Sequence, residues 1–462
     1  MTLFKGNEAF IHASKISIPR LTGSDGEKEA ADYIKEKLKE TGWGIKEEEF
    51  FIPLTPFPLF KLLLGIILLF IAFSRLYISS SPLFFGLLII FSAIFLIFSL
   101  KIWLLILHSD FYHQKKRGIK SKNIVASLND EKDFRKGKLF LVAHYDSKSQ
   151  NLSLPLRSIT SVLLIIFLLS TGFLFFLYFL NPGTVIFGRI RILSLFNVLT
   201  VLNVILLLLL LSDRIENRSA GALDNASGVG VLLELAGILI KNPLRGFSTT
   251  LLFTGAEELG LIGASSFLHR HQKELSKEDI FLNIDSASDK NVMVSMDQKK
   301  EKELFFLIRE AAKESGIKIR SFPFLPGFLM DHLSFSLKGF KTASLYTASK
   351  KSRYIHTSKD TLNLLEKRSL KNIGQLLERI IRGLDSDKLP ARVVAYSGYR
   401  GEESPRSFTV GDKTYDIEKI VSVTKEEDLK RRVTRKFLVI TKAGGENTLL
   451  YDESSGEWFL LY

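Results

Sequence analysis

The chain has 462 residues, of which 46% are hydrophobic, and its formal net charge at pH 7 is +14. This length can bury a large core and can form more than one domain. The sequence contains no cysteine, which excludes a disulfide scaffold and a thiolate metal site. A bound metal ion would therefore need His, Asp and Glu ligands.

The positive charge could serve nucleic acid or an anionic membrane surface. Basic residues cluster beside apolar blocks, as in the segment 113–122, and the sequence shows no aromatic or glycine-rich element that recognises nucleic acid. We therefore expect a lipid bilayer as a partner and no nucleic acid.

Residues 1–53 have the composition of a soluble segment. Apolar residues at helical spacing after Gly26 predict a helix, with Ser24 or Asp25 as its N-cap. The segment Glu47–Ile52 then predicts a short strand that leads toward the first apolar block.

Four blocks rich in Leu, Ile and Phe predict membrane-spanning helices, because a soluble core cannot easily absorb so many apolar residues. The blocks are Leu62–Phe73, Leu83–Leu100, Ile159–Leu180 and Ile192–Leu211. The first block is short, and it spans only with its apolar neighbours and with flanking cations that extend outward. Trp103, just after the second block, is expected to lie at the membrane interface.

The close spacing of the blocks predicts two helical hairpins, at residues 58–107 and 159–212. Each hairpin returns to its starting side, so the N-terminal segment, residues 108–158 and everything after 213 share one compartment. Basic residues beside the spans are more frequent on that side, which predicts a multi-pass membrane protein whose large domain faces the cytoplasm. These residues are Lys115, Lys116, Arg117, Lys120, Lys122, Arg157, Arg214 and Arg218, against Arg75, Arg189 and Arg191 in the opposite loops.

Short apolar runs that alternate with helical patterns predict an α/β domain with a mixed, mostly parallel sheet flanked by helices. The expected strands are Lys138–Ala143, Ser248–Phe253, Ile280–Ile284 and Lys341–Tyr346, and the expected helices are Val229–Ile240, Leu261–His269, Leu304–Ala312 and Leu362–Leu384. The membrane hairpins are then insertions in loops of this domain. Residues 392–462 instead predict a small separate all-β domain of short antiparallel strands.

Acidic residues and a histidine are expected to follow the predicted strands of this domain. They are His144, Asp224, Glu257, Glu258 and Asp285. Each motif is weak alone, because a His-x-Asp pair is more often surface decoration and Asp-Asn-Ala-Ser-Gly is more often a turn that caps a helix. Together they point to the carboxyl ends of the strands, where open α/β sheets bind ligands. Carboxylates gathered there would repel one another unless cations neutralised them, so the sequence predicts a metal site.

Five motifs resemble those of the di-zinc aminopeptidases of the aminopeptidase Y type. They are Ala143-His-Tyr-Asp146, Leu223-Asp-Asn-Ala-Ser-Gly228, Thr254-Gly-Ala-Glu-Glu258, Asn283-Ile-Asp285 and Ile355-His356-Thr. The resemblance covers residues 1–53, 123–157 and 215 to about 385, and it leaves out the hairpins and the β domain. It implies the zinc exopeptidase type of fold, two zinc ions in the active site and the removal of N-terminal residues from peptides.

The resemblance also implies a role for each site residue. The implied metal ligands are His144 and Asp285 for one ion, Glu258 and His356 for the other, and Asp224 as the bridge between them. Asp146 would orient the His144 imidazole, and Glu257 would be the general base that takes a proton from the attacking water. Asp331 and His332 match a pair that lies near the substrate pocket in the family. Asp360 is expected to cap the last long helix.

Two other interpretations stay open. The segment Tyr145-Asp-Ser-Lys148 also resembles glutaminyl cyclases, which share this fold but use one zinc ion to close N-terminal glutamine with loss of ammonia. Those enzymes typically break the Asp-Asn-Ala-Ser-Gly pattern, which is intact here, so we prefer the peptidase. The chain could instead be a membrane scaffold whose peptidase-like domain only binds, although such a domain has no physical need for Glu257.

Overall fold

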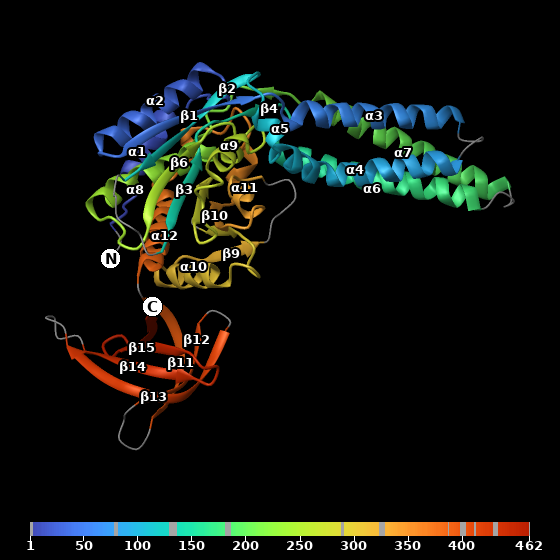
Figure 1. The fold of residues 1–462 in the computed structure, drawn as a ribbon. Coiled ribbons are helices and arrows are strands. Elements are labelled where there is room, and N and C mark those ends of the chain that lie inside the picture. Colours follow the sequence, from blue (N-terminus) through green and yellow to red (C-terminus); the bar gives the residue numbers. More distant parts are fainter. Residues whose placement is uncertain are drawn as a thin grey trace.

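The computed structural model describes residues 3–77, 82–128, 136–180, 186–287, 291–322, 329–386, 388–397, 403–410, 413–427 and 433–461. These residues form an α/β domain, a bundle of four long helices that projects from it, and a β-barrel (Figure 1). Residues 78–81 and 181–185, which fall in the short loops expected within the two hairpins, lie outside the described residues.

The α/β domain is built on an eight-stranded sheet with the strand order β1-β2-β6-β3-β7-β10-β8-β9. The strands are β1 (Gly44–Ile52), β2 (Ile119–Ser127), β3 (Lys138–His144), β6 (Ser248–Thr254), β7 (Ile280–Asp285), β8 (Val292–Ser295), β9 (Ile319–Phe322) and β10 (Lys341–Thr347). The four central strands β6, β3, β7 and β10 are parallel to one another, as the sequence predicts. The outer pairs β1–β2, β2–β6 and β8–β10 are antiparallel, which makes the sheet mixed.

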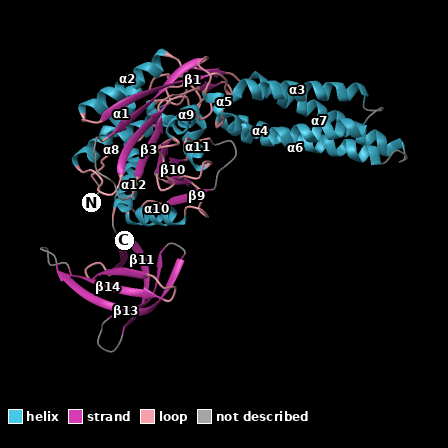
Figure 2. Ribbon diagram, viewed as in Figure 1, coloured by secondary structure: helices cyan, strands magenta, loops and turns pink. Residues whose placement is uncertain are grey.

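Helices cover both faces of the sheet (Figure 2). One layer contains α1 (Asn7–Ile16), α2 (Asp25–Glu40), α8 (Ser227–Lys241), α10 (Lys302–Glu314) and α12 (Lys367–Asp385), and the other contains α5 (Asp110–His113), α9 (Ile262–His271) and α11 (His332–Ser336). Alternate residues of β3 serve the two layers: Leu139 and Leu141 join one core, and Phe140 and Val142 join the other. Ser24 accepts a hydrogen bond from the Glu27 amide and is the predicted N-cap of α2.

Each predicted apolar block forms a long helix. The helices are α3 (Pro56–Tyr77), α4 (Pro82–Leu107), α6 (Leu154–Leu180) and α7 (Ile186–Ser212), and they lie side by side (Figure 1). Pro56–Phe73, Leu154–Leu180 and Ser194–Ser212 are long and apolar enough to cross a membrane, as are Leu83–Ser99 and Lys101–Leu107 taken as a bent pair. The segment Ala222–Lys241 also passes this test, but 78% of it is buried inside the α/β domain.

Glycines bring two of these helices close together. A Cβ atom on Gly172 of α6 would lie 3.1 Å from the Gly86 carbonyl oxygen of α4 and 2.4 Å from Cγ1 of Ile90. Small residues of this kind let helix backbones approach in apolar surroundings. The outer faces of the bundle stay apolar and exposed, with Leu62 and Phe84 as examples.

The C-terminal strands close into a barrel, where the sequence predicts only a set of antiparallel strands. The strands are β11 (Lys388–Ser397), β12 (Glu403–Val410), β13 (Lys413–Glu427), β14 (Val433–Thr441), β15 (Glu446–Asp452) and β16 (Glu457–Leu461). The first part of β11 pairs with β16 and the second part pairs with β12, so this one strand joins the two edges. The barrel core contains Phe408, Phe437 and Trp458.

Candidate functional site

The predicted site residues meet at the carboxyl ends of the parallel strands. His144 is the last residue of β3, and Asp285 is the last residue of β7. Glu257 and Glu258 lie in the loop after β6. Asp224 lies in the non-helical turn Ala222–Ala226 before α8, and His356 follows the turn Lys350–Tyr354 after β10. Segments that are far apart in sequence thus bring all six side chains to one edge of the sheet, as the sequence predicts.

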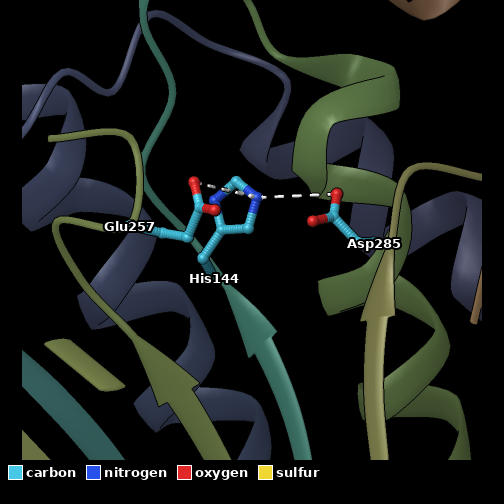
Figure 3. Close-up of side chains that lie close together, drawn as sticks. All are labelled: His144, Glu257 and Asp285. Atoms are coloured by element: carbon cyan, nitrogen blue, oxygen red, sulfur yellow. Dashed lines mark ion pairs between the residues drawn. The ribbon is translucent and has the colours of Figure 1, made fainter. Parts of the chain in front are cut away.

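Three of these side chains, His144, Glu257 and Asp285, form what we call the first triad. The Nε2 atom of His144 is 3.8 Å from Asp285 Oδ1 and 4.0 Å from Glu257 Oε2. Figure 3 shows the imidazole between the two carboxylates. One ligand atom from each residue lies within 4.8 Å of the others, so the first triad can hold a metal ion.

The other three side chains, Asp224, Glu258 and His356, form the second triad. The Nε2 atom of His356 is 2.9 Å from Glu258 Oε2 and 3.2 Å from Asp224 Oδ2. The second oxygen of Asp224, Oδ1, lies 3.1 Å from Nε2 of His144. The carboxylate of Asp224 therefore faces both triads, with one oxygen toward each histidine.

The residues at this edge fit bound cations. Nε2 of His144 is buried and has no hydrogen-bond partner among the described residues, although carboxylate oxygens surround it. Burial raises the pKa of Glu257 well above its usual range and also raises the pKa of Asp285. Burial lowers the pKa of His144, but the nearby carboxylates, with Glu257 first, raise it by more. Divalent cations would neutralise these carboxylates, and a set of nitrogen and oxygen donors suits zinc.

Asp146 holds the turn that carries both glutamates. Its carboxylate accepts hydrogen bonds from the backbone amides of Glu257 (3.1 Å) and Glu258 (3.2 Å) and from Thr22 Oγ1 (3.0 Å). Its Oδ1 atom is 3.5 Å from Nδ1 of His144, which also lies 3.2 Å from the Asp146 carbonyl oxygen. Asp146 therefore lies where the sequence predicts it, beside His144, and it also fixes the positions of both glutamates.

The expectation that Asp360 caps the last long helix is wrong. Helix α12 begins at Lys367, and its N-cap is Glu366. The carboxylate of Asp360 accepts hydrogen bonds from the amides of Leu223 (2.8 Å) and Asp224 (3.2 Å). Asp360 thus supports the turn that presents Asp224, and burial raises its pKa to about 7.

Asn225 fixes the same turn from the other side. Its Nδ2 donates to the Ile284 carbonyl (2.8 Å), and its Oδ1 accepts from the amides of Gly228 (2.9 Å) and Ser286 (3.1 Å). The Asp224–Asn225 peptide bond is cis. These bonds tie the segment that carries Asp224 to the end of β7, next to Asp285.

Asp331 and His332 are buried at the start of α11. Asp331 accepts a hydrogen bond from Thr254 Oγ1 through Oδ2. Its Oδ1 atom and Nδ1 of His332 have no hydrogen-bond partner among the described residues. Burial raises the pKa of Asp331 to about 7 and lowers that of His332 to about 4. Contact of this pair with substrate stays a prediction.

Three residues beside the site carry no site role in the sequence prediction. Lys148 Nζ lies 3.1 Å from Glu258 Oε2, and Arg157 NH2 lies 3.5 Å from His356 Nδ1. Trp103, expected at the membrane interface, is 3% exposed and donates a hydrogen bond from Nε1 to the Gly260 carbonyl (3.1 Å). Lys148 has a weak signal in the sequence, because it belongs to the segment that resembles glutaminyl cyclases. Trp103 and Arg157 have none, because their partners are distant in sequence.

Comparison with known proteins finds a family match for part of the chain. Residues 205–381 match Peptidase family M28, and this range includes Asp224, Glu257, Glu258, Asp285 and His356. The chain contains a peptidase family M28 domain. The resemblance seen in the sequence is thereby confirmed.

Individual relatives cover different shares of the chain. Aminopeptidase YwaD of Bacillus subtilis (strain 168) is 28% identical over 191 residues, which are 38% of this chain and 40% of that protein. BSAP, a zinc aminopeptidase from Bacillus subtilis, matches with a TM-score of 0.48 and 15% identity over 82% of this chain and 94% of its own. A glutaminyl cyclase from an Acidobacteriales bacterium matches with a TM-score of 0.47 and 16% identity over 83% of this chain and 96% of its own. The chain thus matches less than half the length of the curated aminopeptidase.

Proposed function

We propose that the protein is a membrane-anchored zinc aminopeptidase that removes N-terminal residues from peptides. The observation that carries the proposal is the pair of triads at the carboxyl ends of the parallel strands, with Asp224 directing one carboxylate oxygen toward each histidine. The match to Peptidase family M28 supports peptides as substrates, and the relation to aminopeptidase YwaD supports cleavage at the N-terminus.

Different residues of the chain would hold the two zinc ions. His144 and Asp285 would hold one zinc ion and Glu258 and His356 the other, while Asp224 would contact both through its two oxygens. When bound, the ions would polarise the peptide carbonyl and lower the pKa of the attacking water. Asp146 and Asp360 position these ligands through backbone amides.

Glu257 is the proposed general base. Its carboxylate belongs to the first triad, with Oε2 4.0 Å from Nε2 of His144, and a carboxylate that close to a bound ion can reach the attacking water. In this role Glu257 takes the proton from the attacking water and returns it to the departing amine. The same position would also allow Glu257 to be a metal ligand. A variant is therefore needed that distinguishes a general base from a metal ligand.

The test is mass spectrometry of a peptide mixture that includes peptides with N-terminal glutamine. The detergent-purified protein is incubated with zinc beside its Glu257→Gln variant, and the zinc content of both is measured. We expect stepwise loss of N-terminal residues with the unmodified protein only, and equal zinc in both. Ammonia loss confined to the glutamine peptides would replace the aminopeptidase with a cyclase. Unchanged peptides would favour a non-catalytic membrane scaffold, and loss of zinc in the variant would make Glu257 a ligand.

We also propose that α3, α4, α6 and α7 cross a lipid bilayer as two hairpins, with the peptidase domain on the cytoplasmic side. The length and apolar outer faces of these helices support the spans, and the distribution of basic residues supports the side. Protease digestion of a C-terminal tag in sealed vesicles of known orientation tests the side. A tag protected inside right-side-out vesicles agrees with the proposal, and a tag digested from outside contradicts it.

A further inference from the structure

Lys148 contacts both carboxylate oxygens of Glu258, which is one of the candidate metal ligands. Its Nζ lies 3.1 Å from Glu258 Oε2 and donates to the Glu258 carbonyl at 2.8 Å, and its backbone amide is 3.3 Å from Oε1. The Glu258 side chain is 2% exposed and that of Lys148 is 15% exposed, so water screens the pair weakly. The oxygen that Lys148 contacts is also the one that lies 2.9 Å from Nε2 of His356.

A second cation lies on the same side of the site. Arg157, in the first turn of α6, places NH2 at 3.5 Å from Nδ1 of His356. Its charge is partly offset by Asp213, whose Oδ2 is 3.7 Å from NH1. Lys148 has Glu258 as its carboxylate partner within ion-pair distance among the described residues.

The first triad has no such cation in the part of the chain that the structure describes. Among the described residues, no Lys or Arg lies within 4.0 Å of the carboxylates of Glu257 or Asp285, whose ion-pair neighbour is His144. The buried Arg20 donates to the carbonyls of Tyr145 and Gly221. The two triads therefore differ in charge, although their ligand types are alike.

We propose that Lys148 makes the two metal sites unequal, so that the first triad binds its divalent cation tightly and the second triad binds weakly. The proposal rests on the proposed zinc function. A divalent ion at the second triad must share Glu258 with the Lys148 ammonium group and is repelled by it, with Arg157 adding to the repulsion. At a low zinc concentration, the Lys148 ammonium group neutralises part of the negative charge of the second triad that a second zinc ion would otherwise neutralise.

The test measures zinc per chain after equilibration of the full-length protein in buffers of graded free zinc. Lys148→Gln removes the charge, and Lys148→Arg keeps it. Lys138→Gln is the matched control, because Lys138 begins the same strand that ends in His144, and its Nζ contacts only the Glu274 carbonyl at 3.2 Å among the described residues. His356→Ala shows which triad each binding step belongs to.

The unmodified protein should bind one zinc ion tightly and a second only at higher free zinc. Lys148→Gln should tighten the second step by on the order of ten-fold or more, whereas Lys148→Arg and Lys138→Gln should leave it unchanged. His356→Ala should abolish the weak step and keep the tight one. Two equally tight ions in the unmodified protein, or an unmoved second step in Lys148→Gln, would overturn the inference while leaving the zinc peptidase intact. A protein that binds no zinc at any concentration would overturn the proposed function as well.

Discussion

The end of helix α4 packs directly on the turn that carries Glu257 and Glu258. Trp103 is 3% exposed, and its Nε1 donates to the Gly260 carbonyl at 3.1 Å. Gly260 has a φ of +115°, and a Cβ atom there would lie 2.8 Å from Trp103 Nε1. The Gly260 amide in turn donates to the Glu257 carbonyl at 2.8 Å. A helix proposed to span the membrane therefore sets the position of the proposed general base.

The variant Trp103→Phe tests this contact. It leaves the buried Gly260 carbonyl without its donor, which costs about 1–3 kcal/mol, and it removes part of the packing of the indole ring. A shift of the turn would also misplace Glu257, and a misplacement of about 1 Å can cost about 100-fold in rate. We expect kcat for peptide hydrolysis to fall by about ten- to 100-fold, with zinc content retained.

Trp43 provides the matched control. Its Nε1 donates to the Ala236 carbonyl at 3.2 Å, and its side chain is 4% exposed, but its partner lies on α8 and away from the glutamate turn. Trp43→Phe should lower the free energy of unfolding by a similar amount and leave kcat unchanged. Thermal unfolding in detergent and initial rates on one peptide measure both quantities. If both variants lost the same fraction of kcat, or if Trp103→Phe kept full activity, the proposed link from α4 to Glu257 would be refuted.

Two further predictions concern buried carboxylates. Burial raises the pKa of Glu27 from 4.5 to about 7, so the folded state holds a proton that the unfolded state loses between these values. Stability should therefore fall by about 3 kcal/mol as pH rises from 4.5 to 7, and Glu27→Gln should flatten this dependence in unfolding curves measured at several pH values. An unchanged slope in Glu27→Gln would show that another group causes it. Asp360→Ala leaves the Leu223 and Asp224 amides unpaired, so we expect a loss of about 2 kcal/mol or more in unfolding free energy and a lower zinc content. Unaltered zinc binding would mean that Asp360 does not position Asp224.

The central strands of the sheet and the ligand-type residues at their ends could be predicted from the sequence because both depend on local patterns, whereas His356 was predicted from the resemblance to the aminopeptidases. Buried parallel strands are continuous apolar runs, and the chain places ligand-type residues where such runs end. This locates His144 and Asp285 at the ends of β3 and β7 without knowledge of their neighbours. Closure of the barrel was not predictable, because it depends on which edges β11 pairs with.

The supports of the site could not be predicted because they are contacts between distant segments. Asp360 reads locally as a helix cap, yet its partners are the amides of Leu223 and Asp224, more than 130 residues earlier. Lys148 and Glu258 are separated by 110 residues, and Trp103 and Gly260 by 157. Nothing in a local pattern of hydrophobicity or charge selects one distant partner over another, so only the folded structure identifies these pairs.

Both hairpins contact a segment that bears metal-ligand candidates, and this argues against a bundle that only tethers the domain. The first hairpin reaches the glutamate turn through Trp103. The second begins beside Gln150, whose backbone amide donates to the His356 carbonyl at 2.8 Å and whose Nε2 donates to Asp213 Oδ2 at 2.7 Å, at the end of α7. Helices that only anchored the domain would need no contact with the segments that carry the triad residues. Trp103 lies beyond a 48° bend in α4, between Ser99 and Lys101. If this bend transmits the tilt of the bundle to the glutamate turn, the lipid or detergent around the helices should alter kcat in the unmodified protein more than in Trp103→Phe.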